Sequence, residues 1–205
     1  TSVTNLKQKE ENIVEITFKK PEFLKENEKE TLTGAQKGTL VHLCMQKLNE
    51  KEEYHISKIK SLIQELPAKR IITQNEADNI NPFKILEFTK SEIWTDLKQA
   101  KEVYKEKPFY INIPASEIYK EEGGDNLEEN ILVQGIIDLY YIDKDENLVL
   151  VDYKTDYVEP GKKEILIDKY KKQLELYQEA LEKALSKKVD KKYIYSVYLG
   201  KALKI

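Results

Sequence analysis

Two β-rich runs joined by a short polar connection constrain the fold of this chain most. Residues 131–142 and 148–155 are dense in Ile, Val, Leu and Tyr, and the connection between them runs from Asp143 to Asn147. This pattern predicts a β-hairpin. The second run opens with Leu148-Val149-Leu150-Val151, which is apolar on both sides and therefore indicates a buried strand.

The segments around the hairpin predict an α/β domain. Apolar residues at three- and four-residue steps predict helices over 38–49, 53–66, 165–185 and, around Trp94, within 78–104; we expect strands over 109–113 and 192–199 and a polar loop over 120–130. Gly38 and Thr39 suit the start of the first helix, with Thr39 as its cap. Pro108 should end the helical region, because the residue before a proline is biased away from helix. A helical crossover returns a strand parallel to its predecessor, so we predict a mixed central sheet flanked by helices, with an N-terminal helical region.

Composition limits the kinds of protein this chain can be. It has 205 residues, 40% hydrophobic and 35% charged, which is enough for one sizeable core; we expect residues 38–205 to form one domain and residues 1–37 an arm or linker. A net charge of −3 excludes a broadly basic nucleic-acid coat. The single cysteine, Cys44, excludes an internal disulfide and a four-cysteine metal site. With no membrane-length apolar run and no signal-like start, we expect a cytosolic protein; Thr1 in place of Met suggests a fragment or processed product.

Chemistry-bearing residues gather on the predicted hairpin. Asp152 and Lys154 are two apart on one strand, so both project from the same face, and the turn folds the preceding strand back to bring Asp138 near Asp152. Hard cations such as Mg²⁺ prefer carboxylate, carbonyl and water ligands. Asp138, Asp152 and the Tyr153 carbonyl therefore make an incomplete metal shell, beside which Lys154 can orient a water or stabilise a developing charge.

A simpler interpretation exists for each of these residues. An isolated Asp-x-Lys on a strand is usually an exposed charge pair, and Asp138 alone would be a solvated acid near the turn. Here the surrounding strand is apolar on both sides, and burial of an uncompensated acid would be costly, which favours a site.

Three further residues carry weaker signals. His42 lies in an apolar helical stretch, where a satisfied core histidine and a metal ligand are both open. Gln173 and Tyr177 are four apart on the long helix and share a face; they can bind phosphate oxygens, steady Lys154, or simply form a polar boundary pair. Nearby lysines can follow a DNA backbone or form a solvated face: Lys162, Lys163, Lys169, Lys171 and Lys172.

Four motifs together resemble the RecB-type branch of the PD-(D/E)xK nuclease superfamily. They are Gly-Thr-x-x-His at 38–42, Gly-x-x-Asp at 135–138, Asp-Tyr-Lys-Thr at 152–155 and Gln-x-x-x-Tyr at 173–177. More narrowly, segments 20–24, 32–46, 107–109 and 133–138 resemble the C-terminal nuclease domain of the AddA family of helicase-nucleases. The resemblance covers almost the whole chain.

This resemblance implies a restriction-endonuclease-like core and a set of roles. His42, Asp138, Asp152 and the Tyr153 carbonyl would bind Mg²⁺ or Mn²⁺, and Lys154 would be catalytic. Gln173 and Tyr177 would support the site. The acid that often opens the strand before the hairpin in this superfamily has two candidates, Glu106 and Glu117, and both stay outside the predicted site.

The resemblance also implies partners. AddA proteins carry an ATP-driven helicase ahead of this domain and pair with AddB to process double-strand DNA ends for recombination. This chain contains no Walker-type motif, so no ATP site is expected in it.

We therefore expect a metal-dependent DNA nuclease domain of the exonuclease type, acting in a bacterial cytoplasm on a single strand delivered by a helicase. One alternative is a catalytically silent nuclease fold used for DNA binding or subunit docking. Another is a stand-alone recombination or CRISPR-type nuclease, which the AddA-like segments and the single cysteine disfavour.

Overall fold

A computed structural model describes residues 31–114, 130–159 and 161–205. Within these residues the chain forms a five-stranded sheet in the order β1-β2-β3-β4-β5, flanked by helices. The strands are β1 (Glu102–Pro114), β2 (Asn130–Ile142), β3 (Leu148–Lys154), β4 (Val189–Ser196) and β5 (Lys201–Lys204). The helices are α2 (Gly34–Lys47), α3 (Ile56–Ala68), α4 (Gln74–Asp78), α5 (Pro82–Phe88), α6 (Glu92–Gln99) and α8 (Lys163–Leu185).

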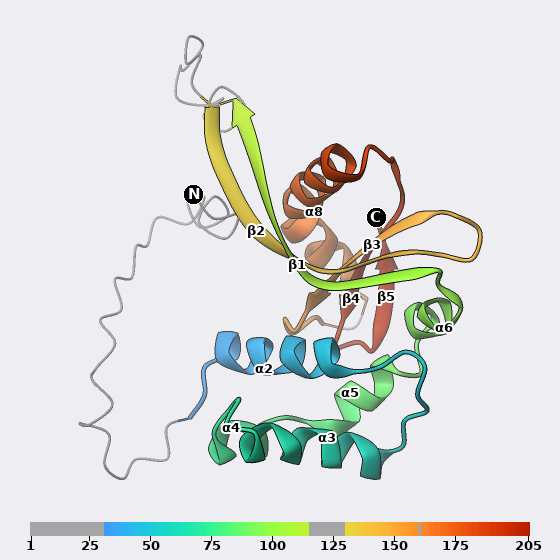
Figure 1. Cartoon of the computed structure of the whole chain (residues 1–205). Helices are drawn as coiled ribbons and strands as arrows, with labels where there is room; N and C mark the ends of the chain where they lie inside the picture. The colour runs from blue at the N-terminus through green and yellow to red at the C-terminus, as the bar shows by residue number, and fades with distance from the viewer. Residues whose placement is uncertain (1–30, 115–129, 160) are drawn as a thin grey trace.

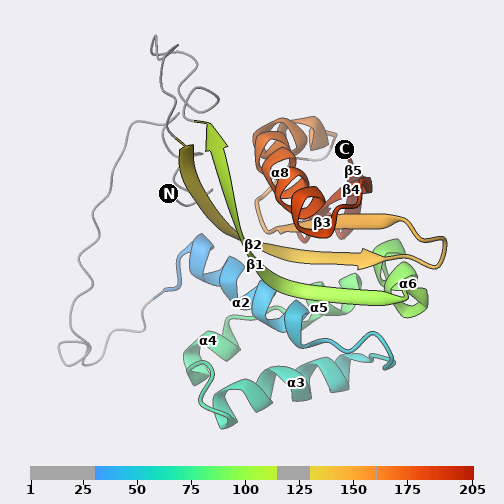
Figure 2. The same cartoon turned by 45° about the horizontal axis from the view of Figure 1, so that its top comes forward.

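The sheet is the middle of three layers. Helices α2 to α6 cover one face and α8 crosses the other (Figure 1 and Figure 2). Alternation along β3 divides its side chains between the two cores: Val149 and Val151 pack with the α2–α6 layer, whereas Leu148 and Leu150 pack with α8. Every β3 residue before Lys154 is buried, as predicted for this strand.

Strand pairing confirms the predicted mixed sheet. β1–β2 and β2–β3 are antiparallel, β3–β4 is parallel across the α8 crossover, and β4–β5 is antiparallel. The predicted hairpin is confirmed, with Leu139 opposite Val151 and Ile142 opposite Leu148.

The β1–β2 ribbon bends midway along its length (Figure 1). Glu106 has φ of 50°, a left-handed conformation that is uncommon outside glycine. The side-chain alternation changes phase at this level: on the facing strand, Leu139 packs with the α2–α6 layer but Ile137, two residues earlier, packs with α8. The bend places Glu106 and Asp138 at one point of the ribbon, because both lie between the paired positions Lys105–Leu139 and Lys107–Ile137.

The structure corrects several local predictions. The helix α2 starts at Gly34, not Gly38, and Thr33 rather than Thr39 caps it, in a capping box with Gln36. The helical region ends at Gln99 and does not reach 104, and the strand predicted over 109–113 begins earlier, at Glu102. Pro108 therefore lies inside β1, which is an edge strand where a missing N–H is tolerated. The last predicted strand begins earlier, at Val189, which pairs with Leu148. Helix α4 and strand β5 were not predicted, because both are too short to show a period.

Two expectations fall mostly on residues that the structure does not describe. The arm or linker over 1–37 falls mostly on residues 1–30, and the polar loop over 120–130 falls on 115–129 except at its last residue. Among the described residues, none of the helices is long and apolar enough to cross a membrane.

Candidate active site

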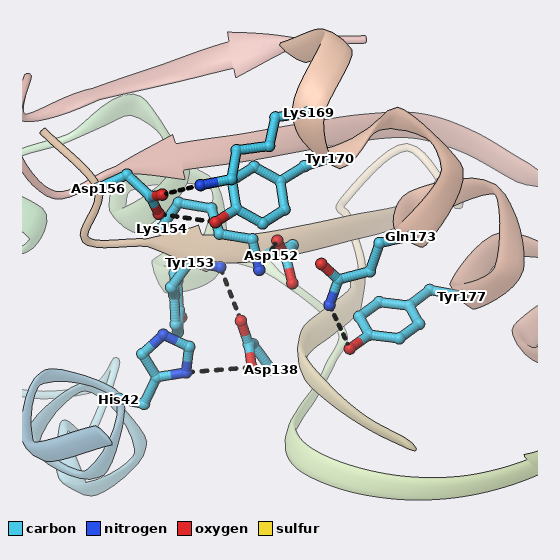
Figure 3. A network of polar contacts seen from close by, with 10 residues as sticks. All are labelled: His42, Asp138, Asp152, Tyr153, Lys154, Asp156, Lys169, Tyr170, Gln173 and Tyr177. Atoms are coloured by element: carbon cyan, nitrogen blue, oxygen red, sulfur yellow. Dashed lines mark hydrogen bonds and ion pairs between the residues drawn. The ribbon is translucent and has the colours of Figure 1, made fainter. Parts of the chain in front are cut away.

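Helix α2 brings His42 against the sheet. The Nδ1 atom of His42 lies 3.2 Å from Asp138 Oδ1, and its ring meets the ring of Tyr153 edge-on at 5.7 Å (Figure 3). Burial alone would lower the pKa of His42, but the hydrogen bond and charge of Asp138 outweigh it, and the pKa is raised. His42 therefore has a polar partner in the site and is not an isolated core histidine.

Asp138 is held from two sides. Its Oδ1 faces His42, and its Oδ2 accepts a 2.7 Å hydrogen bond from the Tyr153 backbone N–H. Its side chain is nearly buried, and burial would raise the pKa of the carboxyl; His42, Lys154 and the Tyr153 amide together lower it. Asp138 is consequently a fixed carboxylate pointing at His42.

Glu106 joins this pair. His42, Glu106 and Asp138 each offer a ligand atom, and all of these atoms lie within 4.8 Å of one another. Burial, and then the negative charge of Asp138, raise the pKa of Glu106. The sequence left Glu106 and Glu117 open; the pairing register, with Lys105 opposite Leu139 and Lys107 opposite Ile137, sets Glu106 across from Asp138. Glu117 lies outside the described residues.

Asp152 and Lys154 project from the same side of β3, toward α8. Lys154 Nζ lies 2.6 Å from Asp152 Oδ2, and the two side chains are only 12% and 1% exposed. That contact lacks hydrogen-bond geometry, so among the described residues Asp152 Oδ2 has no hydrogen-bond partner. Burial raises the pKa of Asp152 to about 6.

These donors fit a hard divalent cation. Two carboxylates and an imidazole converge, and the neighbouring Asp152 carboxylate is buried with Lys154 as its ion-pair partner but with no hydrogen bond to Oδ2, so a cation would stabilise its charge. Asp152 itself is not part of the converging group, because its carboxylate is turned toward Lys154. For Tyr153 the structure gives an amide contact with Asp138, and the role of its carbonyl as a ligand stays a prediction.

Helix α8 supplies the opposite side of the site. Gln173 Nε2 donates a 2.7 Å hydrogen bond to the Tyr177 hydroxyl, so the two residues share a face as expected (Figure 3). Tyr177 also packs edge-on against Phe109 of β1 at 5.3 Å. Burial and the nearby charge of Asp152 raise the pKa of the Tyr177 hydroxyl, which stays protonated.

A cleft of about 450 Å³ opens onto this group. Its lining includes His42, Glu106, Lys154 and Tyr170. At its α2 edge, a Cβ on Gly38 would lie 3.0 Å from Thr155 Oγ1, so the absence of a side chain lets α2 approach the end of β3.

The basic bias of α8 is partly neutralised. Lys169 pairs with Asp156 at 2.8 Å and Lys162 pairs with Glu159 at 2.5 Å. This part of the surface therefore offers less free positive charge than the sequence alone suggested.

The mixed sheet between two helical layers is an α/β architecture, and comparison with known families identifies its class. The sequence model of the PD-(D/E)XK nuclease superfamily matches residues 4–203, and the chain belongs to this superfamily.

Curated relatives narrow the class to the AddA-type subunit of the ATP-dependent helicase/nuclease. The chain is 40% identical over 188 residues to this subunit from Clostridium novyi (strain NT), a match that covers 91% of the chain and 15% of that protein. It is 41% identical over 186 residues to the subunit from Thermoanaerobacter sp. (strain X514), covering 91% of the chain and 15% of that protein. It is 37% identical over 214 residues to the subunit from Acetivibrio thermocellus, a match that covers 98% of the chain and 16% of that protein. The chain thus spans about 15% of the length of these relatives, and the predicted likeness to the AddA family is confirmed.

Proposed function

We propose that this chain is a Mg²⁺- or Mn²⁺-dependent deoxyribonuclease that hydrolyses phosphodiester bonds in single-stranded DNA. The observation that carries the proposal is the convergence of the His42, Glu106 and Asp138 ligand atoms beside a cleft that His42, Glu106 and Lys154 line. Phosphodiester hydrolysis needs an activated water and a means of neutralising charge on the phosphate, and this cleft offers donors for both.

The roles of the residues follow from their contacts. A bound divalent cation supplies Lewis acidity and lowers the pKa of a water. His42, Glu106 and Asp138 would hold it, with the Asp152 carboxylate beside them. Lys154 stabilises the negative charge that develops on the phosphate, because its ammonium is buried, fixed and close to the acids.

Gln173 and Tyr177 act as a supporting pair. Their mutual hydrogen bond fixes the Gln173 amide, which Figure 3 shows on the side of α8 that faces Asp152. We infer that this amide orients the Asp152 carboxylate or a phosphate oxygen.

We further propose a larger setting. The curated relatives are named helicase/nuclease subunits, so we infer that a helicase portion delivers the strand and that an AddB-type subunit completes the machine. Its work would then be exonuclease-type processing of double-strand breaks for repair and recombination, in a bacterial cytoplasm. A silent fold used only for docking is the competing proposal, and the intact Asp152–Lys154 pair disfavours it.

The test is a cleavage assay on a labelled single-stranded oligonucleotide with Mg²⁺ or with EDTA. We expect cleavage by the unaltered chain in Mg²⁺, none in EDTA, and a loss of about 10³-fold or more for Asp152→Asn and for Lys154→Gln. Lys191→Gln is the matched control, because Lys191 forms a similar pair with buried Asp143, 2.8 Å away, in the distal hairpin turn.

Cleavage that survives EDTA, or that both site variants retain, would overturn the metal-nuclease proposal. DNA binding without any cleavage by the unaltered chain would favour the docking role.

A further inference from the structure

Among the described residues, the Lys154 side chain lies close to Asp152 and to the Tyr170 ring, and only the ring has no role in binding a metal. Besides Asp152, its ammonium lies 4.3 Å from the centroid of the Tyr170 ring on α8. A cation over an aromatic face is attracted by the ring quadrupole, and the attraction is stronger when the pair is shielded from water. Tyr170 is buried at 7% exposure and Lys154 is 12% exposed, so this contact is largely desolvated.

The Asp152 contact alone is a poor way to fix the ammonium. Asp152 is a buried carboxylate whose charge interacts with Asp138 and His42 of the candidate metal group, and any charge it gives to a cation is no longer available to Lys154. Lysine also has a long flexible stem, and ordering it costs conformational entropy. The aromatic ring offers Lys154 a partner that does not compete for the cation.

Asp156 fixes the ring in turn. The Tyr170 hydroxyl donates a 2.8 Å hydrogen bond to Asp156 Oδ2, and Lys169 Nζ lies 2.8 Å from Asp156 Oδ1 (Figure 3). Asp156 follows Lys154 by two residues just beyond β3, whereas Tyr170 belongs to α8. The hydrogen bond between Asp156 and Tyr170 therefore connects the segment after β3 to α8 at one wall of the cleft.

We propose that Tyr170, fixed by Asp156, is the positioning residue for Lys154, and that its ring keeps the ammonium aimed into the cleft during catalysis. The inference rests on the proposed nuclease function, since it assigns a role toward the lysine of that site. Substrate binding belongs to other groups, so the loss of the ring should lower kcat and leave KM unchanged.

The first test separates the ring from the hydroxyl. We expect Tyr170→Leu to lower kcat for single-stranded DNA by about tenfold or more with KM within about twofold, because a misplaced catalytic group costs rate rather than affinity. Tyr170→Phe keeps the ring and should recover most of the lost kcat. Asp156→Asn should cost no more kcat than Tyr170→Phe, because its amide oxygen can still accept from the Tyr170 hydroxyl, though without the carboxylate's charge.

Tyr54→Leu is the matched control for stability. Tyr54 is 9% exposed, lies under Lys58 at 5.0 Å and accepts a hydrogen bond from the Asn49 amide, but it belongs to the α2–α6 core away from the cleft. It should lose thermal stability much as Tyr170→Leu does while keeping kcat. Equal losses of kcat in the two Leu variants, or no rescue by Tyr170→Phe, would overturn the positioning role.

The second test does not need activity. An aromatic ring shields nuclei above its face, so in NMR spectra of the chain labelled at the lysine ε-carbons, the ε-methylene protons of Lys154 should appear upfield, with Lys154→Arg giving the assignment. The upfield shift should persist in Tyr170→Phe and vanish in Tyr170→Leu. Its absence in the unaltered chain would overturn the contact itself, whereas a chain with the shift but without cleavage would count against the proposed function instead.

Discussion

At the scale of single residues, Asp152 is the most unfavourably placed acid of the site. Burial raises its pKa from 3.8 to about 6, so the folded chain holds a proton that the unfolded chain releases between about pH 4 and pH 6. The stability that this group contributes is therefore fully present below about pH 4 and is lost as the pH rises through about 6. Above that pH the carboxylate is ionised and buried, which is the state a cation would stabilise.

Metal stabilisation should accordingly depend on pH. We expect Mn²⁺ to raise the melting temperature clearly at about pH 7.5 and little at about pH 5, because protons compete with metal for Asp152 and for His42, whose pKa is also raised. Metal at about a hundred times its Kd would add about 2.7 kcal/mol to the free energy of unfolding, which raises the melting temperature by several degrees. Differential scanning fluorimetry with Mn²⁺ and with EDTA at both pH values measures this; an equal shift at both would contradict it.

Glu106 gives the second prediction at this scale. Because its carboxylate lies within 4.8 Å of the His42 and Asp138 ligand atoms, Glu106→Gln should weaken Mn²⁺ binding by about tenfold or more. Glu102→Gln is the matched control on the same strand, since Glu102 is exposed and accepts a hydrogen bond from the Tyr104 hydroxyl. Isothermal titration calorimetry compares the two, and equal affinities would remove Glu106 from the site.

The sequence predicted part of this site and not the rest for a physical reason. Asp152 and Lys154 follow from the period of one strand, and the short turn brings Asp138 near them. The place of Glu106 could not be predicted, because it depends on how β1 pairs with β2 and on a left-handed backbone at Glu106 itself. Patterns of apolar residues do not record either one.

At the scale of elements, helix α2 carries His42, which lies beside Asp138. The capping residues at the start of α2 fix where this helix begins. The Thr33 hydroxyl accepts the Gln36 N–H at 3.2 Å, and the Gln36 side chain accepts the Thr33 N–H at 2.8 Å. The sequence placed the cap at Thr39 because glycine and threonine commonly begin helices, but Thr33-x-x-Gln36 is the capping box. β2, β3 and α8 were predicted closely because their apolar patterns are continuous, whereas β1, as long as β2, was predicted only over 109–113 because its first half is rich in charged residues.

The cap is testable by stability. Thr33→Ala should lower the free energy of unfolding by about 1 kcal/mol, because the capping box at the start of α2 is lost. Thr39→Ala should change it by less than about 0.5 kcal/mol, since Thr39 is exposed and its hydroxyl bonds the Ala35 carbonyl of its own helix. Urea denaturation of both variants decides this, and a larger loss for Thr39→Ala would contradict the observed cap.

At the scale of the whole molecule, the burial of the acids sets what substrate can reach them. Asp138 and Asp152 are 7% and 1% exposed, so a scissile phosphate has to enter the cleft. Duplex DNA is stiff over about 150 base pairs, whereas a single strand bends readily into a cleft. The net charge of −3 also gives the chain little general attraction for duplex DNA.

The chain should therefore prefer single strands. We expect cleavage of a single-stranded oligonucleotide and little cleavage of the same sequence as a blunt duplex, with a duplex that carries a single-stranded tail cut only in its tail. Gel analysis of the end-labelled products measures this. Equal cutting of the blunt duplex would contradict the proposal that a helicase must supply the strand.

Locating the metal decides whether a nuclease site lies at the bend of the β1–β2 ribbon. Crystals of the chain soaked in Mn²⁺ should show an anomalous difference peak bounded by His42, Glu106 and Asp138, on the side where Asp152 lies. That peak should be absent from crystals of Asp138→Asn. A fully occupied peak elsewhere, with these three side chains unliganded, would show that the metal site lies in another part of the molecule.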